Sequence, residues 1–395
     1  MAFASRLPSH EALRAIFLSS YVPRECGLAT FAEDVIQAVT AHGVDCKVGA
    51  MNRVGEDHTY DPRVVFTVRE DRLSDYVRAA ARINQGFDVL SVQHEFGIYG
   101  GVECEHLLSL LEAVDIPTVT TLHTLLREPS PAMRANLRAV AARSTALVVM
   151  NSLAIDILER VYGVNPAKVV MIHHGAPVPP RERLRTAKHD MNLQGHKVIS
   201  TFGLLSSGKG IEYAIEAMAH VVAEHPQAIY LILGQTHPIV KQQEGERYRD
   251  GLKTRARELG IEEHIRFVDK FFTKAELIAY LMATDIYLTP YLNMEQVTSG
   301  TLAYAMACGR SLVSTPYLHA QFLLGEERGL LVPPCDPRGI AQACLTILND
   351  PALQARLERT NWRYGQTMSW GRVGQDYLRL FQHAARLNAS SAVVA

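Results

Sequence analysis

Short apolar runs alternate with helical patterns along almost the whole chain, and this alternation restricts the fold more than any other feature. The runs are nearly continuous in apolar residues, which is typical of strands covered on both faces. In the first half the predicted strands are Ala15–Ser19, Cys46–Ala50, Val64–Val68, Val89–Gln93, Thr118–Leu122, Ala146–Met150 and Val169–Ile172. In the second half they are Val198–Phe202, Ile229–Leu233, Ile265–Val268, Ile286–Thr289, Leu312–Ser314 and Leu330–Val332. The alternation predicts an α/β protein with parallel, doubly wound sheets.

The predicted helices lie between these strands. They are Thr30–Ala41, Ser74–Asn84, Cys104–Ala113, Ala132–Ala141, Leu153–Tyr162, Ile211–Ala223, Gly245–Leu259, Lys274–Ala283, Gly300–Ala307 and Ile340–Leu348. A chain of 395 residues is too long for a single hydrophobic core. The alternation of strands and helices is interrupted by a proline-rich segment near residues 176–197. We therefore predict two tandem Rossmann-like domains, residues 1–178 and 197–370, joined by a linker at 179–196. Ligands in such sheets bind at the carboxyl ends of the strands, so a cleft between the domains is expected.

Composition excludes several classes of protein. A formal net charge of −1 argues against nucleic-acid binding through bulk electrostatics. The six cysteines are scattered without a CxxC pair, as expected in a reducing cytosol. No signal peptide is evident and no apolar run approaches the ~20 residues that span a bilayer, so we expect a cytoplasmic protein. A basic stretch (Arg127, Arg134, Arg138, Arg143) predicts a solvated helix face, with peripheral contact to the inner membrane face as the alternative.

Residues 197–218 predict a strand, a loop of phosphate size and a helix. The apolar run ends at Gly203, the loop carries Ser207, Gly208 and Lys209, and Gly210 opens the helical pattern. Free N–H groups and the positive end of the helix dipole favour an anion there, and a lysine adds a point charge. Gly210 replaces the Ser/Thr that would hold Mg²⁺ in a P-loop NTPase, so that enzyme class is a distant alternative. An ordinary turn with a solvated lysine is the simpler interpretation.

A second dense region spans residues 291–316. Ser299, Gly300 and Thr301 follow a strand and are able to open a helix, which would present further N–H donors to an anion. Glu295 precedes them and could accept hydrogen bonds from sugar hydroxyls. Gly309 is placed to end that helix in the left-handed conformation. A plain strand–helix turn is the simpler alternative.

Polar residues also follow the strands of the first half. Gly27 comes after the first strand, His94 and Glu95 end another, and His123 ends the next. His174 follows the last strand and would face the cleft or line the hinge. His and Glu at the carboxyl edge of a sheet suit sugar contacts or proton handling, although a lone histidine is more often structural.

Several catalytic motifs are missing from the sequence. It contains no DxD, HExxH or paired-cysteine motif, so we expect no divalent metal. It also lacks GxSxG, which argues against a serine hydrolase.

At these motifs the chain resembles the retaining glycosyltransferases of family 4, which have the GT-B fold. The segments that carry the resemblance are FGLLSSGKGIEYAIEAM, EQVTSGTLAYAMACGRSLVSTP, TLHT and the glycine loop after the first strand. It extends to a C-terminal SWGRVGQDYLRLF, where the fold implies a helix, about residues 371–392, that crosses back to the first domain. The resemblance is specific in the second domain and looser in the first.

The resemblance implies transfer of a hexosyl group from a nucleotide-diphosphate sugar to a hydroxyl acceptor, with retained anomeric configuration. The acceptor would be a glycan, a lipid-linked molecule or a small molecule, held mainly by the first domain. No metal and no other cofactor is implied, and no oligomeric state is predicted. The resemblance carries over to Lys209, which would face the donor diphosphate, to His123 near the transferred sugar, and to Gly27 near the donor phosphates. Together with the loops and strand ends described above, we predict Lys209, His123 and Glu295 as catalytic residues. The predicted donor-binding residues are Gly27, Gly203, Ser207, Gly208, Lys209, Gln296, Ser299, Gly300 and Thr301. The predicted acceptor-side residues are His94, Glu95 and His174.

Two departures from the family pattern suggest a divergent branch. Leu204 stands where the family usually has an arginine, and Gln296 and Tyr304 occupy the positions of its E-x7-E pair. The second of those glutamates usually holds the nucleotide ribose. A glycoside phosphorylase on the same scaffold, or a non-catalytic sugar- or nucleotide-binding protein, is therefore an alternative function.

Overall fold

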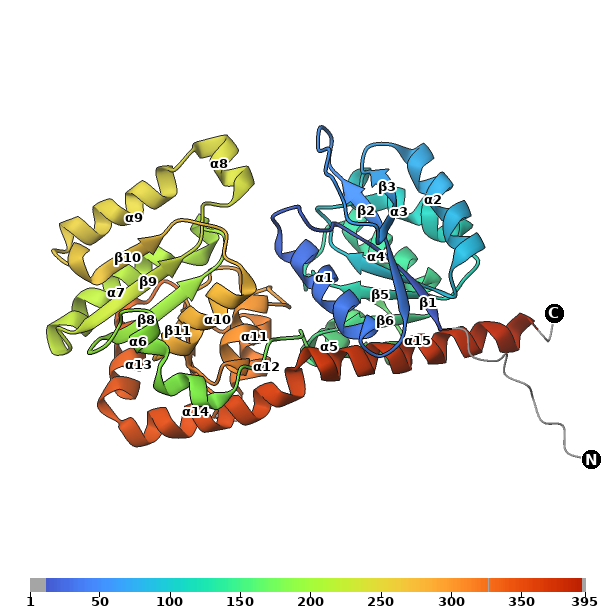
Figure 1. The fold of residues 1–395 in the computed structure, drawn as a ribbon. Coiled ribbons are helices and arrows are strands. Elements are labelled where there is room, and N and C mark those ends of the chain that lie inside the picture. The colour runs from blue at the N-terminus through green and yellow to red at the C-terminus, as the bar shows by residue number, and fades with distance from the viewer. Residues whose placement is uncertain (1–11, 326, 393–395) are drawn as a thin grey trace, which may run out of the picture. The chain divides into compact units, whose positions relative to one another are not determined.

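The structure, a computed structural model, describes residues 12–325 and 327–392 (Figure 1). The chain forms two compact units. Unit 1 comprises Met1–His173 and Trp370–Ala395, and unit 2 comprises His174–Ser369. Each unit contains one parallel sheet with helices on both of its faces, as the alternation of strands and helices predicts.

Unit 1 contains a seven-stranded sheet in the order β3-β2-β1-β4-β5-β6-β7. Its strands are β1 Arg14–Ser19, β2 Asp45–Asn52, β3 Val64–Arg69, β4 Val89–His94, β5 Thr118–Leu122, β6 Ala146–Val149 and β7 Val169–Met171. Its helices are α1 Gly27–Thr40, α2 Leu73–Gly86, α3 Glu105–Ala113, α4 Pro131–Arg143, α5 Leu153–Tyr162 and α15 Trp370–Ala392. The order reverses between β1 and β4, which is where open α/β sheets bind ligands.

Two apolar clusters bury the two faces of this sheet. On one face α1 packs against α15, and Phe31, Val35, Tyr377 and Phe381 belong to the same apolar cluster. On the other face α2 and α3 supply residues such as Tyr76. The C-terminal helix therefore completes the core of the unit that begins the chain, as Figure 1 shows for the red helix α15 beside α1.

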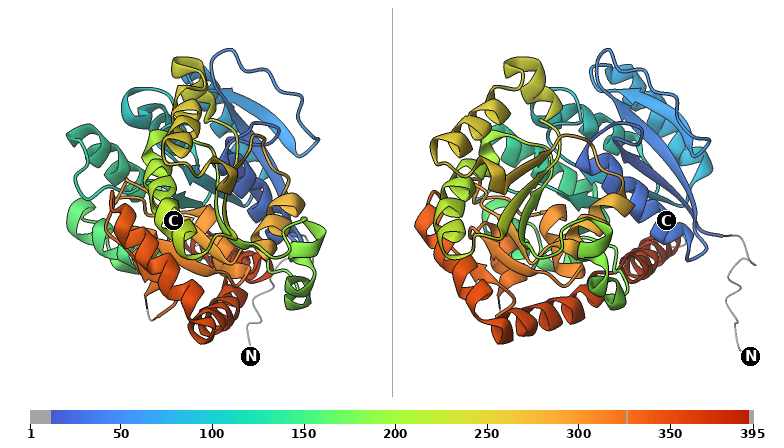
Figure 2. Two further views of the ribbon diagram at one scale, coloured as in Figure 1. Left: turned by 90° about the vertical axis from the view of Figure 1, so that its left-hand side faces the viewer. Right: turned by 60° about the vertical axis from the view of Figure 1, so that its left-hand side comes forward.

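Unit 2 contains a six-stranded sheet in the order β10-β9-β8-β11-β12-β13. Its strands are β8 Lys197–Phe202, β9 Ala228–Leu233, β10 Ile265–Val268, β11 Ile286–Thr289, β12 Ser311–Ser314 and β13 Leu330–Leu331. Its main helices are α6 Ala187–Asp190, α7 Ile211–Glu224, α8 Pro238–Glu244, α9 Arg247–Glu258, α10 Lys274–Ala283, α11 Gly300–Ala307, α12 Leu318–Leu324, α13 Pro337–Asn349 and α14 Pro351–Gly365. Helices α7, α9 and α13 cover one face, and α10, α11 and α12 cover the other (Figure 2).

The structure confirms every predicted strand but corrects several helices. The helix predicted at 245–259 is α9, within two residues at either end. Helix α8, which precedes it and ends at Gly245 with a φ of +64°, was not predicted. Helices α12 and α14 were not predicted. The proline-rich segment predicted as a linker contains α6 and is folded onto unit 2, because Ala187 and Leu193 are buried in that core.

Candidate functional site

Lys209 lies at the carboxyl edge of the unit 2 sheet, between β8 and α7. It ends a single 3-10 turn, Ser207–Lys209, and Gly210 follows it as the residue before α7. Its Nζ lies 3.9 Å from the centroid of the Tyr291 ring, a cation–π contact. No carboxylate of the described residues pairs with it. Burial lowers the pKa of Lys209 to about 8, because the charged form loses hydration without gaining a counter-ion.

Glycines make this arrangement possible. Gly210 has a φ of +61°, and a Cβ there would lie 2.2 Å from the carbonyl oxygen of Pro290. Gly234, after β9, has a φ of +143°, and its Cβ would lie 2.0 Å from the carbonyl oxygen of Gly203. Side chains at either position would push apart the loops that follow β8, β9 and β11. The backbone N–H of Leu292 also donates to the carbonyl of Gly208 at 3.0 Å.

Tyr291 connects Lys209 to the first turn of α11. Its hydroxyl is hydrogen-bonded to Thr301 Oγ1 at 2.9 Å, and its ring stacks on Tyr317 at 5.3 Å. Ser299 caps α11 by accepting a hydrogen bond from the N–H of Leu302 at 3.3 Å. A Cβ on Gly203 would come within 3.6 Å of Thr301 Cγ2. The lysine loop and the first turn of α11, both predicted to bind an anion, are therefore joined through Tyr291.

His174 lies against this helix terminus, within unit 2. A Cβ on Gly300 would lie 2.8 Å from His174 Nε2, so the imidazole covers that glycine. His174 Nδ1 donates to the carbonyl of Gly175 at 2.8 Å, which leaves Nε2 unprotonated in the neutral ring. Burial lowers the pKa of His174 to about 4, so the ring is neutral at physiological pH.

Tyr304 occupies the position expected for the ribose-binding glutamate and is part of the core. It is 7% exposed, and its ring lies 6.4 Å from that of Phe202 and 6.2 Å from that of His174. Gln296, at the other glutamate position, donates from Nε2 to the carbonyl of Thr298 at 2.8 Å and so stabilises its own loop. Glu295 is half-buried beside it, and its N–H donates to Asn293 Oδ1 at 3.0 Å. Ser207 and Gly208 are exposed at the tip of the lysine loop.

The predicted residues of unit 1 gather at the carboxyl ends of β1, β4 and β5. The His123 ring meets Phe31 of α1 edge to face at 4.9 Å, one turn from Gly27, which begins that helix. A Cβ on Gly27 would meet nothing within 4 Å, so the position is open. The N–H of His123 also donates to the carbonyl of His94 at 3.0 Å. The carboxyl edge of this sheet therefore brings His123, His94 and the start of α1 together.

His94 and Glu95 are less accessible than the sequence suggests. His94 is fully buried, and neither ring nitrogen has a side-chain hydrogen-bond partner among the described residues. Burial lowers the pKa of His94 to about 4. Glu95 accepts hydrogen bonds from Thr124 Oγ1 at 2.7 Å and from the N–H of Phe96 at 2.9 Å. Burial raises the pKa of Glu95 despite these bonds. A sugar could contact His94 only after the residues that bury its ring had moved aside.

Three residues that organise the site were not singled out in the sequence. Tyr291 supplies the ring beneath Lys209. His319 Nδ1 accepts the N–H of Ser299 at 2.8 Å and fixes the start of α11. Gln93 Oε1 accepts the Nε2–H of His123 at 2.9 Å, while its own amide donates to Ser91 Oγ at 3.3 Å. Of these three residues, only Gln93 had a signal in the sequence, because it stands at a strand end directly before His94.

The two Rossmann-like units, each with a parallel sheet flanked by helices, have the architecture of GT-B glycosyltransferases. Two family models match: Glycosyltransferase Family 4 over residues 26–178 and Glycosyl transferases group 1 over residues 196–350. Together the matches cover most of the chain, including the lysine loop and the start of α11. The chain belongs to glycosyltransferase family 4.

Characterised relatives share about a quarter of their residues with this chain. The D-inositol 3-phosphate glycosyltransferase of Kineococcus radiotolerans is 26% identical over 304 residues, covering 70% of this chain and 68% of the relative. The phosphatidyl-myo-inositol mannosyltransferase of Propionibacterium freudenreichii is 24% identical over 328 residues, covering 79% and 78%.

Solved structures show the same fold. HepE of Anabaena in complex with UDP has a TM-score of 0.73 at 15% identity, covering 94% of this chain and 100% of that one. Sucrose-phosphate synthase of Thermosynechococcus elongatus has a TM-score of 0.72 at 18% identity, covering 94% of this chain and 98% of that one.

Within the described residues, no group of three or more His, Cys, Asp or Glu side chains is arranged to hold a metal ion. None of the helices described is both long enough and apolar enough to span a membrane.

Proposed function

We propose that this glycosyltransferase moves a hexosyl group from a nucleotide-diphosphate sugar to a hydroxyl acceptor, with retention of the anomeric configuration. The observation that carries the proposal is the Lys209 ammonium, which is desolvated, held on Tyr291 and paired with no carboxylate of the described residues. A buried cation without a counter-ion is costly, and an anionic ligand would remove that cost. A diphosphate is the anion that every donor of this class carries.

The leaving diphosphate would be stabilised by two sources of positive charge. Lys209 supplies a full charge, and the N–H groups of the first turn of α11, capped by Ser299, supply partial charges. The bond between the anomeric carbon and the leaving phosphate oxygen breaks while the acceptor oxygen bonds to the same carbon from the same face. The acceptor proton passes to the phosphate oxygen that leaves. The charges at Lys209 and α11 favour this step because they act where negative charge develops.

We assign sugar-side roles to His123 and Glu295. His123 is oriented by Gln93, whose Oε1 accepts its Nε2–H. In the proposal it orients the transferred sugar, and Glu295 accepts hydrogen bonds from sugar hydroxyls.

The proposed reaction takes place in the cytoplasm and requires no metal ion. Addition of EDTA to dialysed enzyme should therefore leave turnover unchanged, and a loss restored by Mg²⁺ would count against the metal-independent mechanism.

Binding of a nucleoside diphosphate should weaken as the pH rises through about 8. The protonated form of Lys209 attracts the diphosphate, and burial lowers its pKa to about 8, so the free protein loses this charge above that pH. Titration calorimetry with UDP or GDP from about pH 6.5 to 9.5 measures the effect, because the diphosphate itself is already ionised there. Lys209→Arg is the control, since a guanidinium stays charged across this range. The same pH profile in both proteins would exclude Lys209 as the titrating group.

The activity test follows release of nucleoside diphosphate from UDP- and GDP-hexoses over an acceptor panel. Inositol phosphates and lipid-linked inositols enter the panel because two relatives are named for them, and UDP-sugars enter it because HepE was crystallised with UDP. The anomeric proton coupling of the product, read by NMR, reports retention or inversion. Transfer with retained configuration is the expected result. An inverted product would overturn the retaining mechanism while leaving the donor assignment intact.

A glycoside phosphorylase is the second candidate, and the position of Tyr304 favours it. An apolar ring stands where the family's ribose-binding carboxylate is expected, and Leu204 replaces the expected arginine. Lys209 and α11 would then hold inorganic phosphate, whose oxygen attacks the anomeric carbon while the aglycone oxygen takes the proton. Phosphate-dependent release of a sugar 1-phosphate, without turnover of any sugar nucleotide, would establish this alternative.

A further inference from the structure

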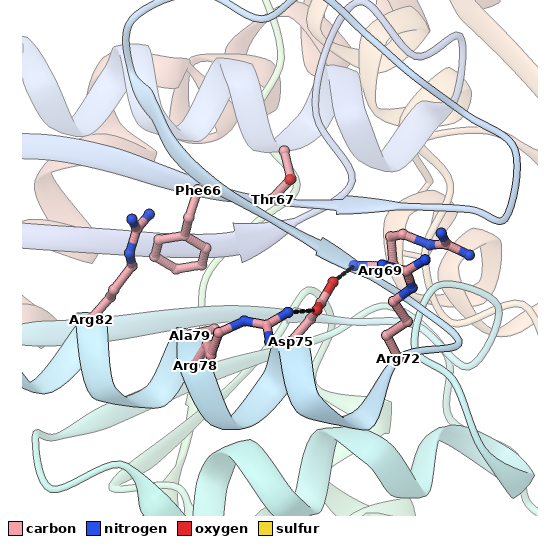
Figure 3. Close-up of a pocket in the computed structure, with 8 residues that line it drawn as sticks. All are labelled: Phe66, Thr67, Arg69, Arg72, Asp75, Arg78, Ala79 and Arg82. Atoms are coloured by element: carbon pink, nitrogen blue, oxygen red, sulfur yellow. Dashed lines mark hydrogen bonds and ion pairs between the residues drawn. The ribbon is translucent and has the colours of Figure 1, made fainter.

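An open pocket lies along the edge of the unit 1 sheet, between β3 and α2. Its volume is about 520 Å³, which is within the usual range for ligand pockets. Figure 3 shows Arg82 and the Phe66 ring at one end, Arg69 and Arg72 at the other, and the Arg78–Asp75 pair between them. Strand β3 is at the edge of the sheet, so no further strand covers this side.

The four arginines that line this pocket outnumber the carboxylates that pair with them. Arg69 pairs with Asp71 at 3.0 Å, and Arg78 pairs with Asp75. Arg82 donates from Nη1 to the carbonyl of Val65 at 3.0 Å, which is a neutral acceptor. The Arg72 side chain is exposed and has no hydrogen-bond or ion-pair partner among the described residues. Two positive charges are thus left without a carboxylate, and most of the guanidinium N–H groups remain available.

The helix register explains why these charges face one pocket. Residues 75, 79 and 82 follow one another at intervals of four and three on α2, so they form a single stripe that lines the pocket. Arg72 is the residue directly before that helix and lines the pocket beside its first turn. The small Ala79 side chain leaves room in the middle of the stripe. The Phe66 ring, packed over Gly49, adds an apolar wall. The pocket therefore offers guanidinium groups at both ends and the apolar Phe66 ring at one of them.

We propose that the pocket between β3 and α2 binds the phosphate group of a phosphorylated ligand, separately from the donor site. Planar guanidinium groups bind phosphate oxygens in pairs, which single lysines do not do. The apolar wall at Phe66 suits an organic group attached to the phosphate. The pocket belongs to unit 1 and Lys209 to unit 2, so this proposal does not depend on the proposed function.

The first test measures binding of inorganic phosphate and sn-glycerol 3-phosphate by ³¹P line broadening at low salt. The full chain carries Lys209→Ala, which removes the lysine of the other anion site. Arg72→Gln together with Arg82→Gln is the test variant. Arg160→Gln together with Arg379→Gln is the control, because it removes the same charge from exposed positions on α5 and α15 in the same unit. Circular dichroism checks that both variants fold.

We expect the test variant to bind glycerol 3-phosphate about tenfold more weakly and the control to bind it as the parent does. Arg72→Gln alone should give part of this loss without lowering the melting temperature, because its side chain has no partner to lose. Equal affinity in the test variant and the parent would overturn the proposal. Equal losses in the test and control variants would also overturn it, since they would indicate general charge attraction.

The second arm identifies the source of the phosphate. Sedimentation with phosphatidylcholine vesicles, with or without phosphatidylglycerol, is compared for the same two variants. Binding to phosphatidylglycerol vesicles that the test variant loses and the control keeps would support a lipid headgroup. Binding of glycerol 3-phosphate without any vesicle binding would support a soluble phosphate ester. Failure to bind either probe would overturn the proposal.

Discussion

Replacing Lys209 by alanine is expected to lower kcat/KM by about 100- to 1,000-fold, the usual effect of removing a group that stabilises charge in the transition state. The ammonium is positioned by the Tyr291 ring at 3.9 Å and has no described carboxylate to neutralise it, so its charge is available to the leaving diphosphate. Most of the loss should appear in kcat, because the leaving group carries more charge in the transition state than in the bound donor. Steady-state kinetics with the best donor and acceptor measures it.

Lys253→Ala is the matched control for this substitution. Lys253 also faces an aromatic ring in unit 2, Phe267 at 6.0 Å, but it is exposed and pairs with Asp250. Its removal should change kcat/KM less than twofold. Lys209→Arg keeps the positive charge but replaces the compact ammonium by a planar guanidinium, and we expect this variant to retain part of the activity. Full turnover of Lys209→Ala would remove the central residue of the mechanism.

Gly210→Ala is expected to destabilise unit 2 by about 2–4 kcal/mol and to abolish binding at the lysine loop. The backbone has a φ of +61°, and the new Cβ would lie 2.2 Å from the carbonyl oxygen of Pro290 and 3.1 Å from Leu292 Cδ2. A backbone oxygen cannot move aside as a flexible side chain would. The loop after β8 would separate from the loop after β11, which carries Tyr291.

Gly208→Ala tests the same loop without the clash. Its φ is not positive and a Cβ would meet nothing within 4 Å, so the free energy of unfolding should change by less than ~0.5 kcal/mol. Urea unfolding followed by far-UV circular dichroism compares the two variants. Equal stabilities for the two variants would mean that contact between these loops does not hold the site together.

The strands and the overall architecture could be predicted because their signals are local. Each strand is an apolar run closed by a turn or a polar residue, and alternation with helices allows few topologies. Helix α14 also had a local signal that was missed, since Asp350 precedes Pro351 and accepts the N–H groups of Ala352 and Leu353. Helix α12 is only seven residues long and largely buried, so it lacks the polar stripe that marks a surface helix.

The candidate site was predictable in its backbone loops but not in its side-chain contacts. Glycine and lysine in the loop after β8, and Ser299 before α11, follow from general rules for anion binding at helix N-termini. The contact between Lys209 and Tyr291 joins residues 82 positions apart in the sequence and depends on the order of β8 and β11 in the sheet. The burial of His94 and the packing of His174 on Gly300 likewise arise from tertiary structure, which no local motif encodes.

The arrangement of Lys209 and α11 is the central feature of this account, and a ligand titration tests it most directly. The melting temperature is measured against UDP, GDP, ADP and inorganic phosphate, for the native chain and for Lys209→Ala, because a ligand that binds only the folded state raises it. The account predicts that one nucleoside diphosphate stabilises the native chain and that Lys209→Ala loses this effect. Stabilisation of equal size in both proteins, or no response to any nucleoside diphosphate, would contradict it.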